Sequence, residues 1–202
     1  MASKKEYEYC QCMRAKKKKF KKEEIITSFL VKRSQLCVLV DGVADLIRYD
    51  KKGNKTIVER YTKDDIFGEL FYNVSTNSEL NVVAMKDCTV IFFDVEDLYA
   101  PCNEKCSYHT TLHQDLLQRI IKKTQMQNTR IELLSKRSIR DKLLSYFQFV
   151  GGTYNKTFTI PFSYTDLADY MNVERSALMR ELKNLSEDGF IKRDGSKITL
   201  LY

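Results

Sequence analysis

The sequence predicts an α+β protein with an N-terminal antiparallel sandwich or barrel, a long helix and a C-terminal winged helix-turn-helix domain. Three observations predict this order. Short apolar runs separated by turn residues fill residues 25–95. A helical period without Pro or Gly then covers residues 107–150. Two short helical segments and a hairpin pattern follow in the last 40 or so residues. The expected parts are residues 1–106, 107–135 and 136–202.

The apolar runs of the first part have lengths typical of antiparallel strands. Turn sequences such as Asp41-Gly42 and Lys52-Gly53-Asn54 stand between them. Short strands joined in this way are typical of a β sandwich or barrel. The expected strands cover residues 25–30, 36–40, 43–49, 56–61, 80–84 and 89–93.

Composition and charge exclude several classes of protein. Hydrophobic residues make up 43% and charged residues 30%, which is ordinary for a globular chain and too apolar for a disordered one. No apolar stretch approaches the roughly 20 residues of a membrane span, and no signal-peptide core follows the first lysines. We therefore expect a cytoplasmic protein without a membrane partner. Most of the net charge of +7 lies in the run Lys16–Lys22, which we interpret as a solvated surface strand or turn.

The second part predicts a helix of about 25 residues. Apolar residues recur at three- to four-residue spacing, and the stripe is long for a small domain. Pairing with a second copy is the simplest way to cover such a stripe, so we expect a homodimer. A helix packed only on its own domain is the alternative. The expected dimer seam consists of Leu112, Leu116, Ile120 and Ile131.

The third part carries a helix-turn-helix pattern. Helical periodicity covers residues 165–171 and 175–185, and Asn172 lies in the turn between them. Asn tolerates the left-handed backbone that a tight turn of this kind needs. The expected buried face of the second helix consists of three leucines at i, i+4 and i+7, namely Leu178, Leu182 and Leu185.

The outward side chains of this pattern suit double-stranded DNA. The second helix of such a module lies in the major groove, where Arg175 and Arg180 can each donate two hydrogen bonds to a guanine edge. Asp194-Gly195 is a strong turn signal, so residues 190–200 predict a hairpin wing with basic side chains for phosphate. A plain helical bundle with exposed arginines is the alternative. The expected DNA contacts are Thr165, Arg175, Ser176, Met179, Arg180, Lys183, Lys192, Arg193 and Lys197.

These motifs resemble the Crp/Fnr family of bacterial transcription regulators over about residues 20–202. The matching segments are Phe67-Gly68-Glu69-Leu70 in the barrel, Ser138–Leu144 at the start of the last domain, and Asp166–Tyr170, Arg175–Leu178 and Arg180–Leu182 in the helix-turn-helix. The resemblance implies a jelly-roll effector domain, a dimer through the long helix and a palindromic DNA target. It also implies that Arg175, Ser176 and Arg180 occupy base-contacting positions. RNA polymerase is a further candidate partner.

The effector site departs from the pattern of members that bind cyclic nucleotides. In those members an Arg-Ser pair before the next strand follows Gly-Glu-Leu, but Ser78 and Glu79 stand at these places here. A glutamate repels the phosphate that the arginine would bind, and no other arginine lies between Arg60 and Arg119. We therefore expect that cyclic AMP is not the effector and that Glu69 stabilises a turn. The candidate pocket residues are Phe67, Gly68, Glu69, Leu70, Ser78 and Glu79.

The cysteines raise a second effector hypothesis. Cys102, Cys106 and His109 stand where the barrel leads into the long helix, and relatives in this family include iron–sulfur, haem and thiol sensors. Thiolate and imidazole ligands suit a metal or an iron–sulfur cluster, so redox or metal sensing is one alternative. Unligated thiols, with Cys37 and Cys88 buried in strands, are the other.

Two further functions are alternatives, a cupin-like enzyme and a constitutive DNA-binding protein. A cupin-like enzyme would need several histidines on the strands, but the chain has only His109 and His113, both after the last expected strand. We therefore expect no enzymatic activity. A constitutive DNA-binding protein, in which the barrel is only a scaffold, is the third option.

Overall fold

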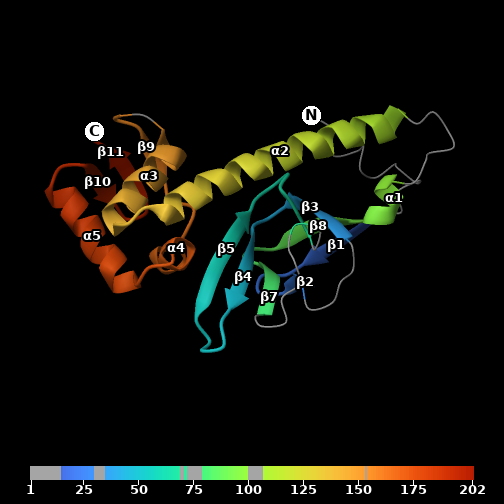
Figure 1. Ribbon diagram of the computed structural model, residues 1–202, viewed down its shortest axis with the longest axis horizontal. Coiled ribbons are helices and arrows are strands. Elements are labelled where there is room, and N and C mark those ends of the chain that lie inside the picture. Colours follow the sequence, from blue (N-terminus) through green and yellow to red (C-terminus); the bar gives the residue numbers. More distant parts are fainter. Residues whose placement is uncertain (1–14, 30–34, 69–70, 72–78, 100–106, 153) are drawn as a thin grey trace. The chain divides into compact units, whose positions relative to one another are not determined.

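In the computed structural model the chain forms two compact units, residues 1–125 and 126–202, which divide within one long helix (Figure 1). The structure describes residues 15–29, 35–68, 71, 79–99, 107–152 and 154–202. Among these residues, no helix is long and apolar enough to cross a membrane.

The first unit contains two four-stranded antiparallel sheets. This arrangement, followed by helices and a helix-turn-helix, confirms the expected α+β class. In the first sheet the order is β1 (Lys16–Phe20), β8 (Cys88–Asp94), β3 (Gln35–Asp41) and β6 (Ile66–Gly68). In the second it is β2 (Ile25–Ser28), β7 (Glu79–Ala84), β4 (Ala44–Tyr49) and β5 (Lys55–Tyr61).

The two sheets enclose the main core of this unit. Side chains alternate along a strand, so Cys37 and Leu39 of β3 point to the opposite face from Leu36 and Val38. The inner set packs with Leu46 and other residues of the second sheet in one buried cluster. The outer set also lies in a buried cluster, so the first sheet is covered on both faces. This double burial explains why its central strands, β3 and β8, are apolar over most of their length.

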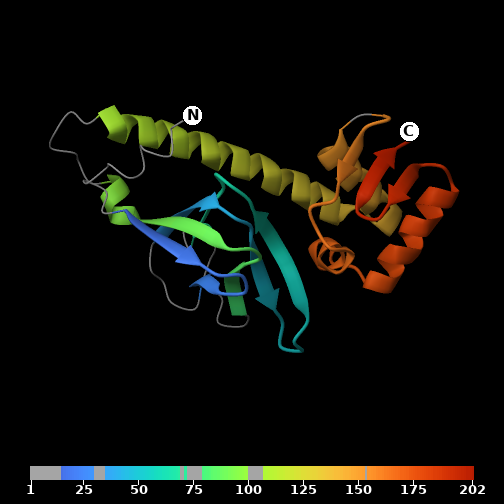
Figure 2. The same ribbon diagram turned by 180° about the vertical axis from the view of Figure 1, so that it is seen from behind.

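Helix α2 (Ser107–Ser135) covers the outer face of the first sheet (Figure 2). Leu116 is 6% exposed and belongs to the cluster formed by Leu36, Val38, Ile91 and their neighbours. The expectation that Leu116 lies in a dimer seam is therefore wrong, because this side chain completes the core of its own domain. A separate short helix, α1 (Val95–Tyr99), follows β8 directly.

The basic run forms strand β1 at the edge of the first sheet. Its four lysines, Lys16 to Lys19, are all exposed, and the strand pairs antiparallel with β8. Lysines on an edge strand disfavour pairing with further strands, because they would bring like charges together.

The second unit contains the last turns of α2, three helices and a small sheet in the order β10-β11-β9. Ser138 and Ser163 cap two of the helices, since each side-chain oxygen accepts from the backbone N–H three residues later. The elements are α3 (Ile139–Gly151), β9 (Thr157–Thr159), α4 (Tyr164–Met171), α5 (Arg175–Glu187), β10 (Ile191–Asp194) and β11 (Lys197–Leu200).

Gly68 ends β6 in a conformation that only glycine adopts easily. Its φ is +134°, and a Cβ at this position would lie 2.2 Å from the carbonyl oxygen of Gln35. The close approach of β6 to β3 therefore requires a glycine at position 68. This requirement is structural and does not depend on any role of the Phe67–Leu70 motif in binding an effector.

We predict that Gly68→Ala destabilises the first unit by about 3 kcal/mol, because backbone strain and a backbone clash act together. Gly53→Ala is the matched control. Gly53 also has a positive φ, +81°, but nothing lies within 4 Å of the added methyl group. It should cost about 1 kcal/mol. Urea unfolding followed by circular dichroism measures the free energy of unfolding of both variants. Equal losses in the two variants would show that the contact of the added methyl group with Gln35 does not contribute to the destabilisation.

Candidate nucleic-acid interface

Helix α5 is held by an apolar face with no exposed surface. Leu178, Leu182 and Leu185 are all 0% exposed. Leu167 and Ala168 of α4 are also buried, and the small Ala168 side chain suits the contact of two crossing helices. These residues fix which side of α5 faces the solvent.

The turn between α4 and α5 has the geometry that the sequence predicts. Asn172 adopts a left-handed conformation with φ 53° and ψ 55°. The backbone N–H of Val173 then donates to the carbonyl oxygen of Ala168 at 3.1 Å. The turn closes helix α4 and starts α5 three residues later.

The side chains expected to contact DNA all lie at the surface of the second unit. On α5, Met179 is half-buried and the four others are exposed, namely Arg175, Ser176, Arg180 and Lys183. Thr165 on α4 is also exposed, as are Lys192, Arg193 and Lys197 on the β10–β11 hairpin. Their spacing along α5 places Ser176, Arg180 and Lys183 opposite the leucine face, whereas Arg175 and Met179 lie nearer to its edge. Their role in binding DNA stays a prediction.

A tyrosine ties the hairpin to the helix-turn-helix. The hydroxyl of Tyr164, the first residue of α4, donates to the carbonyl oxygen of Gly195 in the hairpin turn. The guanidinium of Arg193 lies 5.7 Å from the centre of the same ring. The sequence analysis missed Tyr164, because the contact joins residues 31 positions apart.

Arg140 of α3 anchors the C-terminal half of α5. Its Nε donates to Oε1 of Glu181 at 2.7 Å, and its Nη2 donates to the carboxylate of Asp188. The guanidinium also lies 5.5 Å from the ring centre of Phe190. The hydrogen bonds to Glu181 and Asp188 raise the pKa of Arg140. The sequence placed Arg140 in a family motif but assigned it no contact.

A second arginine joins the end of α2 to the helix-turn-helix. The guanidinium of Arg130 stacks 4.0 Å from the ring centre of Tyr170, and its Nη2 donates to the carbonyl oxygen of Tyr170 at 3.1 Å. Lys142 of α3 reaches the carbonyl oxygen of Met171 at 3.3 Å. The C-terminal end of α4 is therefore held by two cations.

The candidate effector residues are only partly described. Phe67 is fully buried and stacks on Tyr61 with ring centres 4.9 Å apart, so it is a core residue of the barrel. Glu69, Leu70 and Ser78 lie outside the described residues, as does the side chain of Glu79.

The residues expected to bind a metal or to sense redox state are also only partly described. Cys102 and Cys106 are outside the described residues, and so is the side chain of His109. Cys37 and Cys88 are buried, and burial raises the pKa of the Cys88 thiol. Within the described part of the chain, no group of three or more His, Cys, Asp or Glu residues could hold a metal ion.

The exposed apolar side of α2 differs from the expected seam. Ile120 and Ile131 are 41% and 66% exposed, and the side chain of Leu112 is not described. Leu117 and Ile121, which the expected seam does not include, are 59% and 49% exposed. Leu117 follows Leu116 by one residue, which is a rotation of about 100° around the helix.

Comparison with known proteins agrees with this geometry. Residues 17–105 match the model of the cyclic nucleotide-binding domain, and residues 124–202 match the model of the Crp-like helix-turn-helix domain. The chain thus joins a cyclic nucleotide-binding-like domain to a winged helix-turn-helix, which is the architecture of a DNA-binding transcription regulator. It belongs to the Crp/Fnr family. None of the curated proteins matches the chain significantly.

Several solved structures share this fold. CprK in complex with OCPA has a TM-score of 0.74 and 15% identity, covering 99% of this chain and 92% of that one. A CooA variant from Carboxydothermus hydrogenoformans has a TM-score of 0.73 and 12% identity, covering 92% and 83%. The c-di-GMP responsive global regulator CLP of Xanthomonas campestris has a TM-score of 0.66 and 12% identity, covering 93% and 94%.

We predict that Tyr164→Phe loosens the hairpin without unfolding the second unit, because it removes a hydrogen bond worth about 1 kcal/mol. Amide hydrogen exchange at residues 194–197 should accelerate several-fold. Tyr154→Phe is the control, since Tyr154 is 62% exposed and belongs to neither α4 nor the hairpin. Unchanged exchange in the Tyr164→Phe variant would show that packing alone places the hairpin.

Proposed function

We propose that this protein is a homodimeric transcription regulator that recognises a palindromic operator through helix α5. The outward face of α5, set by the buried leucines on its other side, carries the proposal. Its N-terminal end presents Arg175 and Ser176 to a base edge, and Arg180 follows after about one and a half turns. A helix of this kind reads the major groove with its first residues.

The roles of the basic side chains follow from their chemistry. Arg175 and Arg180 are exposed and can donate paired hydrogen bonds to the O6 and N7 atoms of guanine. Lys192, Arg193 and Lys197 lie on the hairpin, where a flexible cation can neutralise phosphate and release counterions. The proposed division is therefore sequence recognition by α5 and general affinity from the hairpin.

The homodimer proposal rests on the exposed apolar side of α2. Leu117, Ile120, Ile121 and Ile131 are large, exposed and on one side of the helix, with Thr124 between them. They extend over about 21 Å at 1.5 Å per residue. A neighbouring face of the same helix is already used by Leu116 against the barrel. A second copy of α2 is the occupant that a twofold-symmetric DNA site requires.

The proposed effector is not a cyclic nucleotide. Besides the missing Arg-Ser pair, two arginines of this unit already donate to carboxylates. Arg60 donates two hydrogen bonds to the fully buried carboxylate of Asp45, at 2.7 and 2.6 Å. Arg119 donates to Asp115 at 2.7 Å. A cyclic phosphate would have to displace one of these carboxylates.

We predict that Arg180→Ala relaxes recognition at one base pair of each half-site. The wild-type protein should enrich a palindromic sequence from a random DNA pool. The variant should lose roughly 1–3 kcal/mol at its own base pair and bind the other bases there equally well. Lys192→Ala is the matched control and should weaken all sequences by a similar factor. If Arg180→Ala enriched the same sequence as wild type, α5 would not read that position.

We predict that Ile131→Glu separates the dimer, because two carboxylates would meet across the twofold axis in an apolar seam. Light scattering should report monomers, and operator affinity should fall at least 100-fold because a single half-site binds weakly. Gln118→Glu adds the same charge to an exposed position of α2 away from this side and should stay dimeric. A dimeric Ile131→Glu variant would place the interface elsewhere.

A further inference from the structure

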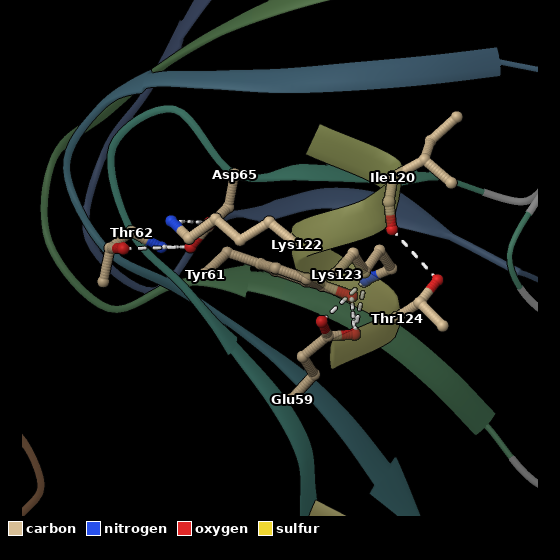
Figure 3. Close-up of polar contacts among 8 residues, drawn as sticks. All are labelled: Glu59, Tyr61, Thr62, Asp65, Ile120, Lys122, Lys123 and Thr124. Atoms are coloured by element: carbon tan, nitrogen blue, oxygen red, sulfur yellow. Dashed lines mark hydrogen bonds and ion pairs between the residues drawn. The ribbon is translucent and has the colours of Figure 1, made fainter. Parts of the chain in front are cut away.

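Lys123 is a lysine buried on the barrel-facing side of helix α2. It is 7% exposed, and its Nζ lies 2.6 and 2.7 Å from the two carboxylate oxygens of Glu59 on β5 (Figure 3). Lysine is almost never buried to this extent without a partner. The pair therefore forms only when helix and strand hold one particular alignment.

Aromatic side chains enclose the ammonium group. Its Nζ lies 4.9 Å from the ring centre of Tyr61 and 5.1 Å from that of Phe71. The hydroxyl of Tyr61 donates to Oε2 of Glu59 at 3.0 Å, so the same carboxylate accepts from two side chains. Besides Phe71, the cluster thus draws together α2 and β5.

The neighbouring lysine provides a comparison within the same helix. The Nζ of Lys122 lies 3.6 Å from Oδ1 of Asp65, but the Lys122 side chain is 63% exposed. Asp65 is held independently, because its Oδ2 accepts from the backbone N–H and the hydroxyl of Thr62 at 2.8 and 2.9 Å. An exposed pair of this kind contributes little, since solvent screens it. The two adjacent lysines therefore differ in burial while both pair with a carboxylate of the barrel.

The buried pair defines geometry more than it adds stability. Burial lowers the pKa of Lys123, and the charge of Glu59 and its hydrogen bond raise the pKa but do not fully offset that loss. Exchange of such a pair for neutral side chains is often close to neutral for stability, whereas removal of one partner leaves a buried charge. A slip of α2 by one residue would rotate Lys123 by about 100° and separate the charges.

Three anchoring side chains lie at intervals of seven residues on one face of α2. Leu116 packs in the apolar cluster on the outer face of the first sheet, and Lys123 donates a hydrogen bond to Glu59. Arg130 stacks on Tyr170 of α4. Seven residues are close to two helical turns, so these positions share a face. Arg130 lies in the second unit, where it contacts the first helix of the helix-turn-helix.

We propose that Lys123 and Glu59 are positioning residues that fix the rotation and register of α2 against the barrel, and thereby control operator affinity. This inference rests on the proposed DNA-binding function. It assigns to one buried ion pair the transmission from barrel to reading helix, with no contact to DNA required from either residue.

The test uses full-length protein and four variants. Lys123→Met and Glu59→Gln each remove one charge, and the double variant Lys123→Met/Glu59→Gln removes both with similar volumes. Lys122→Met is the matched control for the exposed pair. Three quantities are measured: the urea midpoint, amide hydrogen exchange of residues 117–130, and affinity for the DNA fragment that wild-type protein enriches.

Glu59→Gln should lower the urea midpoint most, and the double variant should recover most of that loss. The double variant should nevertheless exchange its α2 amides at least 10-fold faster and change DNA affinity at least 10-fold, whereas Lys122→Met should match wild type in all three. If exchange or DNA affinity of the double variant stays within twofold of wild type, the proposal is overturned. If wild-type protein enriches no DNA, the proposed function fails, and hydrogen exchange alone then decides whether the pair positions α2.

Discussion

Helix α2 meets its barrel along one narrow face, and the rest of the structure depends on this contact. Leu116 closes the apolar cluster over the first sheet, and Lys123 sits between two aromatic rings against Glu59. One contact is apolar and tolerant of small shifts, whereas the other is an ion pair that is satisfied in a single alignment. Together they decide which side of α2 the barrel leaves uncovered. Further along the same helix, Arg130 stacks on Tyr170 of α4 within the second unit.

Helix α5 is positioned by the same principle, in which an apolar face sets its orientation and charged groups set its register. The leucines of α5 bury one side completely, and Arg140 holds its C-terminal half through Glu181 and Asp188. Tyr164 fixes the hairpin relative to α4. The exposed basic side chains of the second unit are thus presented from elements that are each anchored from behind. Preorganisation of this kind reduces the ordering cost of binding DNA.

The sequence predicted features that depend on local pattern and missed those that depend on distant contacts. The left-handed Asn172 and the buried face containing Leu178 could be read from spacing alone. Leu116 was expected in a dimer seam but packs in its own unit, because periodicity shows that a stripe is apolar but not which partner covers it. The pair Lys123 and Glu59 joins residues 64 positions apart, and in sequence both resemble ordinary surface charges.

Placing a photoreactive benzoylphenylalanine at single positions of α2 tests most directly whether its two sides have different partners. Thr124 and Lys122 are both exposed, but only Thr124 lies among the apolar residues of the proposed seam. Irradiation should give a covalent dimer from position 124 and none from position 122. Cross-linking between copies from position 122, with none from position 124, would contradict the assignment of the two helix faces.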